Sequence, residues 1–342
     1  MAALCRGDAG GLPGGGRQRS SQEARLTLTS ILIVNYNGHE LVLRCLESVY
    51  QDAEGSDVEV IVVDNASADG SAEAIAMRFP QARLVRNDRN VGFARAVNQA
   101  MSLATGDLLI LLNNDAYFLP GGLRRLIVFM AAHAEVDVVG PKALNSDGTV
   151  QPSCFRFPTF RDILCESLWL NRLFPKSDFF NRSEMGNFRH DILREVDWVL
   201  GACMAVRRSA VTAAGGLDEH YFMYSEELDW CRAMRRAGQR IYYWPEPTIV
   251  HYGQQQNWRS QRIQGEVLAR GFQSRYYYFE KHYGRGYATW VRLASIGGMA
   301  LRLVATWPAA WLGRQPEAQV RADKYLAVLR ASLRPGSDLS ER

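Results

Sequence analysis

The chain carries few of the features that mark a disulfide framework or a zinc site. Its 342 residues include six cysteines, and no two of them form a C-x-x-C pair. Cys45 and Cys231 lie within stretches whose apolar residues have amphipathic helical spacing. This distribution argues against a zinc site and structural disulfides, and it favours a reducing, cytoplasmic compartment.

Charge of one sign is also scarce. The formal net charge is +4, and no repeat of aromatic and basic residues offers a surface for stacking bases, so we do not expect nucleic acid as a partner. Residues 1–25 are rich in Gly, Arg and Ser and lack an apolar run, which predicts a flexible tail and not a signal peptide. With 47% hydrophobic residues, the chain is long enough for one large α/β domain with an appendage, or for two domains.

From Leu28 onward, short apolar runs alternate with segments of helical spacing. We expect strands at 31–34, 58–63, 83–86, 108–112, 136–139, 196–206 and 240–244, and helices at 41–49, 69–79, 92–104, 120–133 and 225–237. Residues 145–195 have no regular pattern, and 245–253 is expected to be a loop. Strand–helix alternation predicts an α/β fold with a mostly parallel central sheet flanked by helices.

Polar clusters follow three of the expected strands, after Val34, Val63 and Leu112. In open parallel sheets, ligands bind at the carboxyl ends of the strands. The first strand ends in Asn-Tyr-Asn-Gly, not in the glycine fingerprint that a Rossmann dehydrogenase requires. A Gly-rich triphosphate loop with Lys or Arg, expected of a sugar-nucleotide nucleotidyltransferase, is also missing there.

Two residues have the chemistry of metal ligands. Asp115 closes the string Asn113-Asn114-Asp115 at the end of an apolar run, and Mg²⁺ or Mn²⁺ commonly shares one or two carboxylates with a substrate diphosphate. The alternative is a turn rich in Asn and Asp. His251 follows a later strand. Its imidazole is either a further ligand of such an ion or a structural side chain.

An acidic helix start is the candidate for a general base. Ser225 is a plausible N-cap, which puts Glu226 and Glu227 in the first turn of the helix, after an aromatic approach. The amide dipoles at that end favour ionised carboxylates, and acids are therefore common there without any function. The functional alternative is a carboxylate that takes a proton from an acceptor hydroxyl.

Three further residues are weaker candidates. Asp64 ends the second strand, where a carboxylate either holds a nucleoside or caps a turn. Gly92 stands at a helix start, where a ligand can approach the backbone closely. Asn98 follows between one and two helical turns later and need not face the same way.

The segment 293–312 is apolar and about long enough to cross a bilayer, but Arg302 lies in its middle and Pro308 near its end. Basic residues flank it. This pattern favours an interfacial helix beside anionic lipid. The alternative is a buried helix that packs on the rest of the protein.

Six strings, in order, resemble family 2 of the glycosyltransferases, in particular its bacterial rhamnosyltransferase-like branch. They are S-I-L-I-V-N-Y-N-G (30–38), V-D-N-A-S-A-D-G-S (63–71), N-V-G-F-A-R-A-V-N (90–98), L-L-N-N-D-A (111–116), G-A-C-M-A-V-R-R (201–208) and G-G-L-D-E-H-Y-F-M-Y-S-E-E-L-D-W-C-R (215–232). The resemblance extends from about residue 28 to 253. It implies the A-type glycosyltransferase fold and a catalytic domain over 26–255. The aromatic and basic character of the chain after Gln254 predicts a helical, membrane-associated extension over 256–342.

The resemblance also implies roles for single residues. Asn35, Tyr36 and Asp64 would hold the nucleoside, and Asn90, Gly92 and Asn98 would shape the donor pocket. Asp115 and His251 would bind the divalent cation. Glu227 would be the general base. Two positions depart from the family pattern. Asn113 stands where the metal motif has its first acid, and it is expected to remain a donor-binding residue. Glu227 stands where the family has an Asp as its base, so that Glu226 is the alternative base.

The expected function is that of a metal-dependent inverting hexosyltransferase. Its expected donor is dTDP-L-rhamnose, with UDP- and GDP-sugars left open, and its expected acceptor is a lipid-linked or cell-surface polysaccharide intermediate at the cytoplasmic face of the inner membrane. The alternative from another class is an inactive relative that binds carbohydrate or nucleotide. The presence of Asp115, Glu227 and His251 argues against that alternative.

Overall fold

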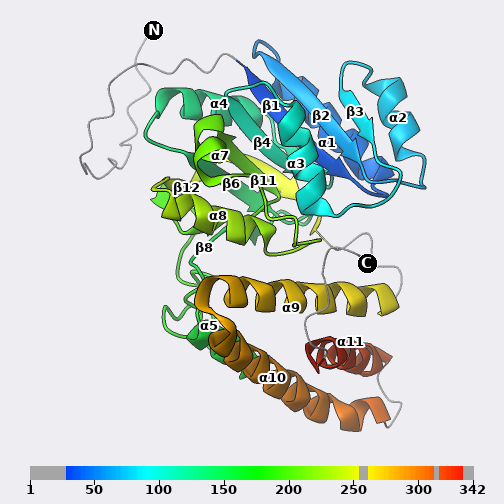
Figure 1. Ribbon diagram of the computed structural model, residues 1–342, viewed down its shortest axis with the longest axis vertical. Coiled ribbons are helices and arrows are strands. Elements are labelled where there is room, and N and C mark those ends of the chain that lie inside the picture. The colour runs from blue at the N-terminus through cyan, green and yellow to red at the C-terminus, as the bar shows by residue number, and fades with distance from the viewer. Residues whose placement is uncertain (1–27, 254–260, 312–315, 334–342) are drawn as a thin grey trace.

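The computed structural model describes residues 28–253, 261–311 and 316–333. The expected tail at 1–25 lies outside these residues. A sheet with helices on both faces forms the upper part of the molecule in Figure 1, and the C-terminal helices lie beneath it. The predicted α/β class is confirmed.

The first half of the chain forms the parallel part of the central sheet. β1 (Thr29–Asn35) lies between β2 (Val58–Asp64) and β4 (Leu108–Asn113), and β3 (Arg83–Arg86) pairs with the outer edge of β2, all in parallel. Each strand lies within a residue or two of its predicted position, because a continuous apolar run marks a strand that is buried on both faces. Asn35 stands beside Asp64, and Val34 beside Asn113.

Alternate side chains of β1 enter two different cores. Ile31 and Ile33 pack against α1 (His39–Asp52), α2 (Ser71–Arg78) and α4 (Gly122–Ala132) on one face. Leu32 and Val34 pack against the helices of the other face, which are α3 (Phe93–Leu103), α7 (Arg208–Ala214) and α8 (Glu226–Arg236). The sheet is therefore covered on both sides, and only its edges and strand ends remain for ligands.

The second half of the sheet is mixed in direction. β11 (Cys203–Arg207) runs antiparallel between β4 and β6 (Val138–Leu144), and β12 (Ile241–His251) pairs parallel to β6 and antiparallel to the short β5 (Ala116–Phe118). The strand expected over 196–206, with an interruption at Gly201, divides there into two strands: β10 (Trp198–Val199) leaves the central sheet and pairs with β8 (Cys154–Phe155), and β11 begins at Cys203.

The prediction of a loop at 245–253 is wrong. β12 continues through Pro245 and Pro247 to His251, with a shift of register between Trp244 and Thr248. A bulge leaves residues outside the ladder, so prolines that lack an N–H are tolerated there. The continuation carries His251 to the edge of the sheet where β4 ends.

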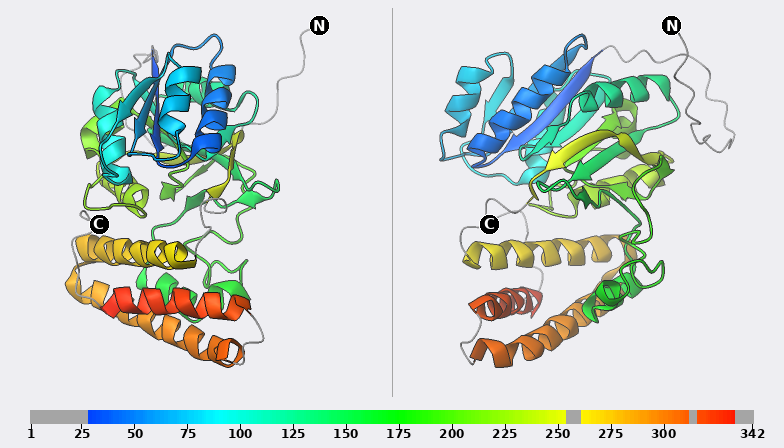
Figure 2. Two further views of the ribbon diagram at one scale, coloured as in Figure 1. Left: turned by 90° about the vertical axis from the view of Figure 1, so that its right-hand side faces the viewer. Right: turned by 180° about the vertical axis from the view of Figure 1, so that it is seen from behind.

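Most of the irregular segment 145–195 forms a lobe below the sheet. Near its ends it pairs with the sheet itself, because β7 (Val150–Gln151) pairs with β6 and β9 (Arg194–Glu195) pairs with β12. Between them lie β8, α5 (Phe160–Ser167) and α6 (Leu170–Leu173). A capping box between Thr159 and Asp162 starts α5, because each side chain satisfies a backbone N–H that the helix leaves open. Figures 1 and 2 show α5 beside α10.

Three C-terminal helices, α9 (Gln261–Tyr283), α10 (Arg285–Trp311) and α11 (Pro316–Leu333), form a separate layer (Figure 2). Their shared core also takes in Ile163 of the lobe and Tyr221 and Leu228 near the start of α8. Among the described residues, no helix is both long enough and apolar enough to cross a bilayer. Arg302 does not face lipid: it is buried and donates from Nη2 to the carbonyl oxygen of Glu166 in α5.

A buried ionic cluster joins α9 to α8. The Asp229 carboxylate lies 2.6 Å from Nε2 of His282 and 2.7 Å from Nζ of Lys281, and the Asp229 and His282 side chains are 4% and 3% exposed. Lys281 also contacts Asp218 at 2.7 Å. Because Asp229 and His282 are shielded from water, removal of Asp229 leaves His282 without its partner in the interior, while Lys281 keeps its pair with Asp218.

We therefore predict that Asp229→Ala lowers the free energy of unfolding by about 3–5 kcal/mol. The matched control is Glu280→Ala, which breaks an exposed pair with Arg285 and should cost no more than about 0.5 kcal/mol. Urea unfolding followed by circular dichroism measures both. Equal, small losses would contradict the role given to Asp229.

Candidate active site

The two predicted metal ligands meet at the edge of the sheet. The antiparallel pairing of β12 with β5 places His251 opposite Ala116, next to Asp115, and the N–H of Tyr252 donates to the carbonyl oxygen of Asp115. As a result Nε2 of His251 lies 3.2 Å from Oδ1 of Asp115. Sequence reasoning proposed both residues, and the structure brings them together.

Gln151, which the sequence did not single out, orients the His251 ring. Its Oε1 lies 2.8 Å from Nδ1 of His251, and its Nε2 donates to Oδ1 of Asn145 at 3.1 Å. Since Oε1 can only accept, Nδ1 donates to it, and Nε2 is the ring nitrogen that faces Asp115. Gln151 lies in β7, within a segment that shows no regular sequence pattern, so no signal pointed to it.

This group of atoms fits a divalent cation that is completed by a ligand. Oδ1 of Asn113 is buried without a hydrogen-bond partner, and its amide nitrogen lies 3.5 Å from Nε2 of His251. A carboxylate, an imidazole and an amide oxygen suit Mn²⁺ or Mg²⁺. Within the described ranges, no cluster of three or more His, Cys, Asp or Glu side chains offers a self-sufficient metal site, so the remaining ligands would come from substrate or water.

The expected nucleoside residues differ in their freedom to bind. Asn35 is fully buried, and its amide donates to Asp64 and Ser71 at 2.8 Å and accepts from Asn114 at 2.8 Å. The Asp64 carboxylate also accepts from Ser67. Tyr36 is 47% exposed. Its ring is therefore free to stack on a ligand, whereas Asn35 and Asp64 hold the strand ends together.

Gly92 and Asn98 contact the segment that leads into α8. A Cβ on Gly92, whose φ is +89°, would come within 2.9 Å of the carbonyl oxygen of Phe222, so only glycine fits this position. The Asn98 side-chain amide makes two hydrogen bonds with the backbone of Leu217. It donates to the carbonyl oxygen and accepts from the N–H, and both bonds are 2.9 Å long. Asn90 accepts a hydrogen bond from the N–H of Gly92 at 3.0 Å and so shapes the turn before α3.

The start of α8 is strained. Tyr224 and Ser225 both have positive φ, at 71° and 67°, which costs non-glycine residues on the order of 1–3 kcal/mol each. Ser225 occupies the N-cap position, as predicted, although it makes no side-chain capping hydrogen bond. Its left-handed backbone turns the chain directly into Glu226 and Glu227.

The two glutamates have different surroundings. Glu226 is almost fully buried, and burial followed by the charge of Glu227 raises its pKa. Glu227 is partly exposed. Burial raises the pKa of Glu227 too, while backbone hydrogen bonds, including one with Gly201, favour its charged form. The Oε2 atoms of both glutamates are buried and have no hydrogen-bond partner, but Glu227 as a whole residue is the more exposed of the two.

The phenol of Tyr224 has a raised pKa. Burial is the main cause, and the charges of Glu226, Glu227 and Asp115 add to the effect. Glu227 itself lies close to the strand end that carries the metal pair: a Cβ on Gly201 would lie 3.4 Å from the Glu227 side chain, and the next residue, Ala202, accepts a hydrogen bond from the N–H of Asn113 at 2.9 Å. A carboxylate with a raised pKa beside a pair of metal ligands is the arrangement expected where a hydroxyl must be deprotonated close to a diphosphate.

Residues 30–195 match the model of glycosyl transferase family 2. The predicted resemblance to this family is therefore confirmed over this range.

Similar proteins agree with this assignment. An N-acetylglucosaminyl-diphospho-decaprenol L-rhamnosyltransferase of Mycobacterium tuberculosis is 28% identical over 237 residues, which are 65% of this chain and 75% of that protein. A mannosyltransferase from Pyrobaculum calidifontis, solved with GDP-Man and Mn²⁺, has a TM-score of 0.53 at 17% identity over 90% of this chain and 86% of its own. GalNAc-T7, solved with UDP, GalNAc and Mn²⁺, has a TM-score of 0.52 at 15% identity, covering 75% of this chain and 50% of its own. These two structures support the predicted A-type fold of the glycosyltransferase.

We predict that Gln151→Ala weakens Mn²⁺ binding by the glycosyltransferase about 10- to 100-fold, since the loss of a group that orients a metal-binding histidine typically has this effect. Gln81→Ala, on the exposed surface, is the matched control and should bind Mn²⁺ as the unchanged protein does. Electron paramagnetic resonance of free Mn²⁺ in the presence of a nucleoside diphosphate measures the affinity. Identical titrations for the two variants would exclude this role for Gln151.

Proposed function

We propose that this glycosyltransferase is an inverting enzyme that moves L-rhamnose from dTDP-L-rhamnose to a hydroxyl of a lipid-linked or cell-surface polysaccharide intermediate. The observation that carries the proposal is the position of Glu227 against Gly201, beside the residue that accepts a hydrogen bond from Asn113 at the end of the strand leading to the Asp115–His251 pair. The choice of donor and acceptor class rests on the similarity to the mycobacterial rhamnosyltransferase. UDP- and GDP-sugars are the alternative donors.

Asp115, His251 and Asn113 are the residues that would hold a divalent cation, Mg²⁺ or Mn²⁺. Such an ion neutralises the charge that a diphosphate leaving group gains as it departs. The exposed ring of Tyr36 supplies a face for the base of the nucleotide, and Asn90 and Gly92 shape the turn beside it. Asn35, Asp64 and Asn98 keep the strand ends and the approach to α8 in place.

Glu227 acts as the general base. Its carboxylate takes the proton of the acceptor hydroxyl while the hydroxyl oxygen forms a bond to the anomeric carbon. The bond from that carbon to the diphosphate breaks on the opposite face, and the electron pair leaves with the nucleoside diphosphate. A single displacement of this kind inverts the configuration and needs no protein nucleophile.

We predict that Glu227→Gln lowers kcat about 10²- to 10⁴-fold, the usual contribution of a general base, with little change in the KM for the donor. Glu226→Gln, on the same helical turn, is the comparison and should keep most of the activity. The assay follows dTDP release from dTDP-L-rhamnose with a prenyl-diphosphate-linked N-acetylglucosamine, and nuclear magnetic resonance gives the configuration of the product. An active Glu227→Gln with an inactive Glu226→Gln would move the base to Glu226, and retained configuration would contradict the mechanism.

The pH dependence follows from the raised pKa of Glu227. Below its pKa the carboxyl is protonated and cannot accept the proton of the hydroxyl, so kcat/KM should fall as the pH decreases through that value. We therefore expect the acidic limb of the pH–rate profile above 4.5, the ordinary glutamate value. A profile that stays flat down to 4.5 would show that the base is not a buried carboxyl.

We further propose that α10 rests on an anionic membrane surface at its cytoplasmic face. Trp290, Leu293, Leu301 and Val304 recur at helical spacing on α10 and are 48–71% exposed. The same helix contains Arg285 and Arg292, whereas Arg302 is buried against α5, and it has no acidic residue. An exposed apolar stripe on a basic helix matches the chemistry of an anionic bilayer interface, where a lipid-linked acceptor would be found.

The combined variant Trp290→Ser, Leu293→Ser and Val304→Ser should reduce binding to phosphatidylglycerol vesicles at least about tenfold, because each apolar side chain contributes on the order of 1 kcal/mol or more when buried in the interface. Its control is Met77→Ser with Val128→Ser, which removes exposed apolar side chains from the sheet domain. Vesicle flotation measures the bound fraction. Equal binding by both variants would reject α10 as the contact surface.

A further inference from the structure

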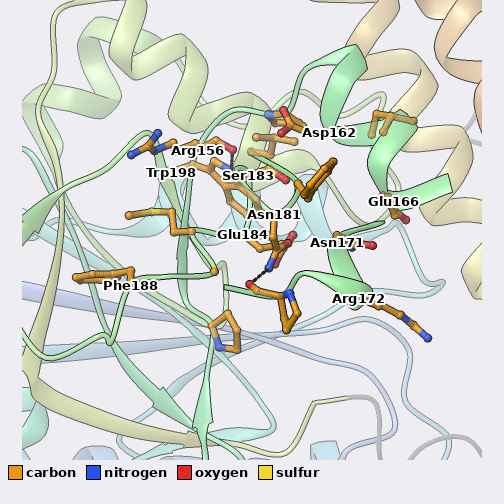
Figure 3. A pocket seen from close by; sticks show the side chains of 18 of the residues that line it. Arg156, Asp162, Glu166, Asn171, Arg172, Asn181, Ser183, Glu184, Phe188 and Trp198 are labelled. Carbon is orange, nitrogen blue, oxygen red and sulfur yellow. Dashed lines mark hydrogen bonds between the residues drawn. The ribbon is translucent and has the colours of Figure 1, made fainter. Parts of the chain in front are cut away.

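A cavity of about 930 Å³ lies between the lobe 145–195, the start of α8 and the C-terminal helices. Figure 3 shows side chains from several segments around it, with Asp162 and Glu166 on one side and Trp198 and Phe188 on another. Its size is in the range of sites that enclose a small-molecule ligand. None of the residues expected to hold the donor lines it.

The walls of the cavity adjoin both parts of the candidate active site. Ser225 and Leu228 line it, and they enclose Glu226 and Glu227 in the sequence. Val150 and Pro152, on either side of Gln151, line it as well. The cavity thus adjoins the segments that carry the proposed base and the residue that orients His251.

Several buried polar atoms of the wall lack partners. They are Oδ1 of Asp162, Nε2 of His190 and Nε of Arg302, all on side chains that are no more than 9% exposed, and Oδ1 of Asn171. Nδ1 of His190 lies 3.0 Å from the carbonyl oxygen of Phe188 and so carries the proton, which leaves Nε2 as an acceptor.

An unsatisfied buried polar group costs about 1–3 kcal/mol. Three acceptors and one donor left open around a single cavity therefore indicate a ligand with several hydroxyl groups, which both donate and accept. The aromatic walls formed by Trp198, Phe188 and Phe180 suit the flat apolar faces of sugar rings. A saccharide meets both requirements.

The cavity also carries an excess of positive charge. Five arginines and three acids line it. Arg275 is paired with Glu166 at 2.8 Å, whereas Arg156, Arg172 and Arg189 form no ion pair with the residues that the structure describes. Guanidinium groups are the usual partners of phosphate oxygens.

The outer surface of the same lobe is apolar. Leu164, Leu168, Leu173, Phe174 and Phe179 are exposed there, next in sequence to lining residues such as Ile163, Arg172 and Phe180. An exposed apolar group of this kind marks a contact with lipid or with another protein. Saccharide, phosphate and lipid contacts thus occur together on one lobe.

We propose that this cavity is the acceptor site and that it receives a saccharide linked through diphosphate to a prenyl lipid. The saccharide lies against the aromatic and unpaired polar groups beside α8, the diphosphate contacts the unpaired arginines, and the lipid follows the apolar surface of the lobe. The inference rests on the proposed function, because it assumes that the transferase uses a lipid-linked acceptor.

The test uses the full chain and a farnesyl-diphosphate-linked N-acetylglucosamine in detergent micelles. Arg172→Ala with Arg189→Ala should weaken binding of this probe at least tenfold and raise its KM similarly, with dTDP affinity and the rate of donor hydrolysis unchanged. Arg89→Ala with Arg124→Ala, two exposed arginines of the sheet domain, should leave all four quantities unchanged. Asn171→Trp, which narrows the cavity without removing charge, should weaken the probe as well.

The outcomes separate the two proposals. Binding that depends on the cavity residues but is not followed by transfer would support the site and contradict the proposed function. Transfer with an unchanged KM in both cavity variants would support the function and overturn the site. If farnesyl diphosphate without the sugar binds as tightly as the full probe, the saccharide part of the inference is wrong, and if the unchanged protein does not bind the probe, the whole inference is wrong.

Discussion

The candidate site depends on the pairing of β12 with β5. This short antiparallel contact places His251 opposite Ala116 and thereby joins two residues, Asn113 and His251, that are 138 positions apart in the sequence. A shift of one residue would turn His251 to the other face of the sheet and separate it from Asp115. The bulge at the two prolines of β12 takes up the change of register within the strand. The end of β12 can therefore pair with β5 in the register that places His251 beside Asp115.

The start of α8 is held from both sides. From the sheet domain, Gly92 packs on Phe222 and Asn98 clasps Leu217. From the C-terminal helices, His282 and Lys281 bind Asp229. These contacts explain how two consecutive residues can remain in the left-handed conformation just before the glutamates. They also make the C-terminal helices part of the structure that positions the base, and not an independent appendage.

Much of the fold could be predicted from the sequence, because the strands of the parallel half are continuous apolar runs that end in turn-forming residues. The site residues at the strand ends followed from the same pattern together with the family resemblance. The extent of β12 could not be predicted, since its prolines are normally breakers and only the partner strands show that they lie in a bulge. Gln151 is an isolated polar residue in an irregular segment, and its role exists only through its contact with His251. The surroundings of Arg302 could not be predicted either. An apolar helix with one charge has the same sequence pattern whether that charge faces α5 or a lipid surface.

The central claim is that Asp115 and His251 bind a divalent cation together with a nucleoside diphosphate, and thermal unfolding tests it most directly. A ligand that binds only the folded protein raises its stability by about 2.7 kcal/mol at 100 times its Kd. The melting temperature is measured with dTDP, UDP and GDP, each with Mn²⁺ or with EDTA, for the unchanged protein, for Asp115→Asn and for Asp88→Asn as an exposed control. The account predicts an increase that requires Mn²⁺, is largest for dTDP, persists in Asp88→Asn and is lost in Asp115→Asn. An increase that is the same with EDTA or in Asp115→Asn, or no increase with any of the three diphosphates, would contradict it.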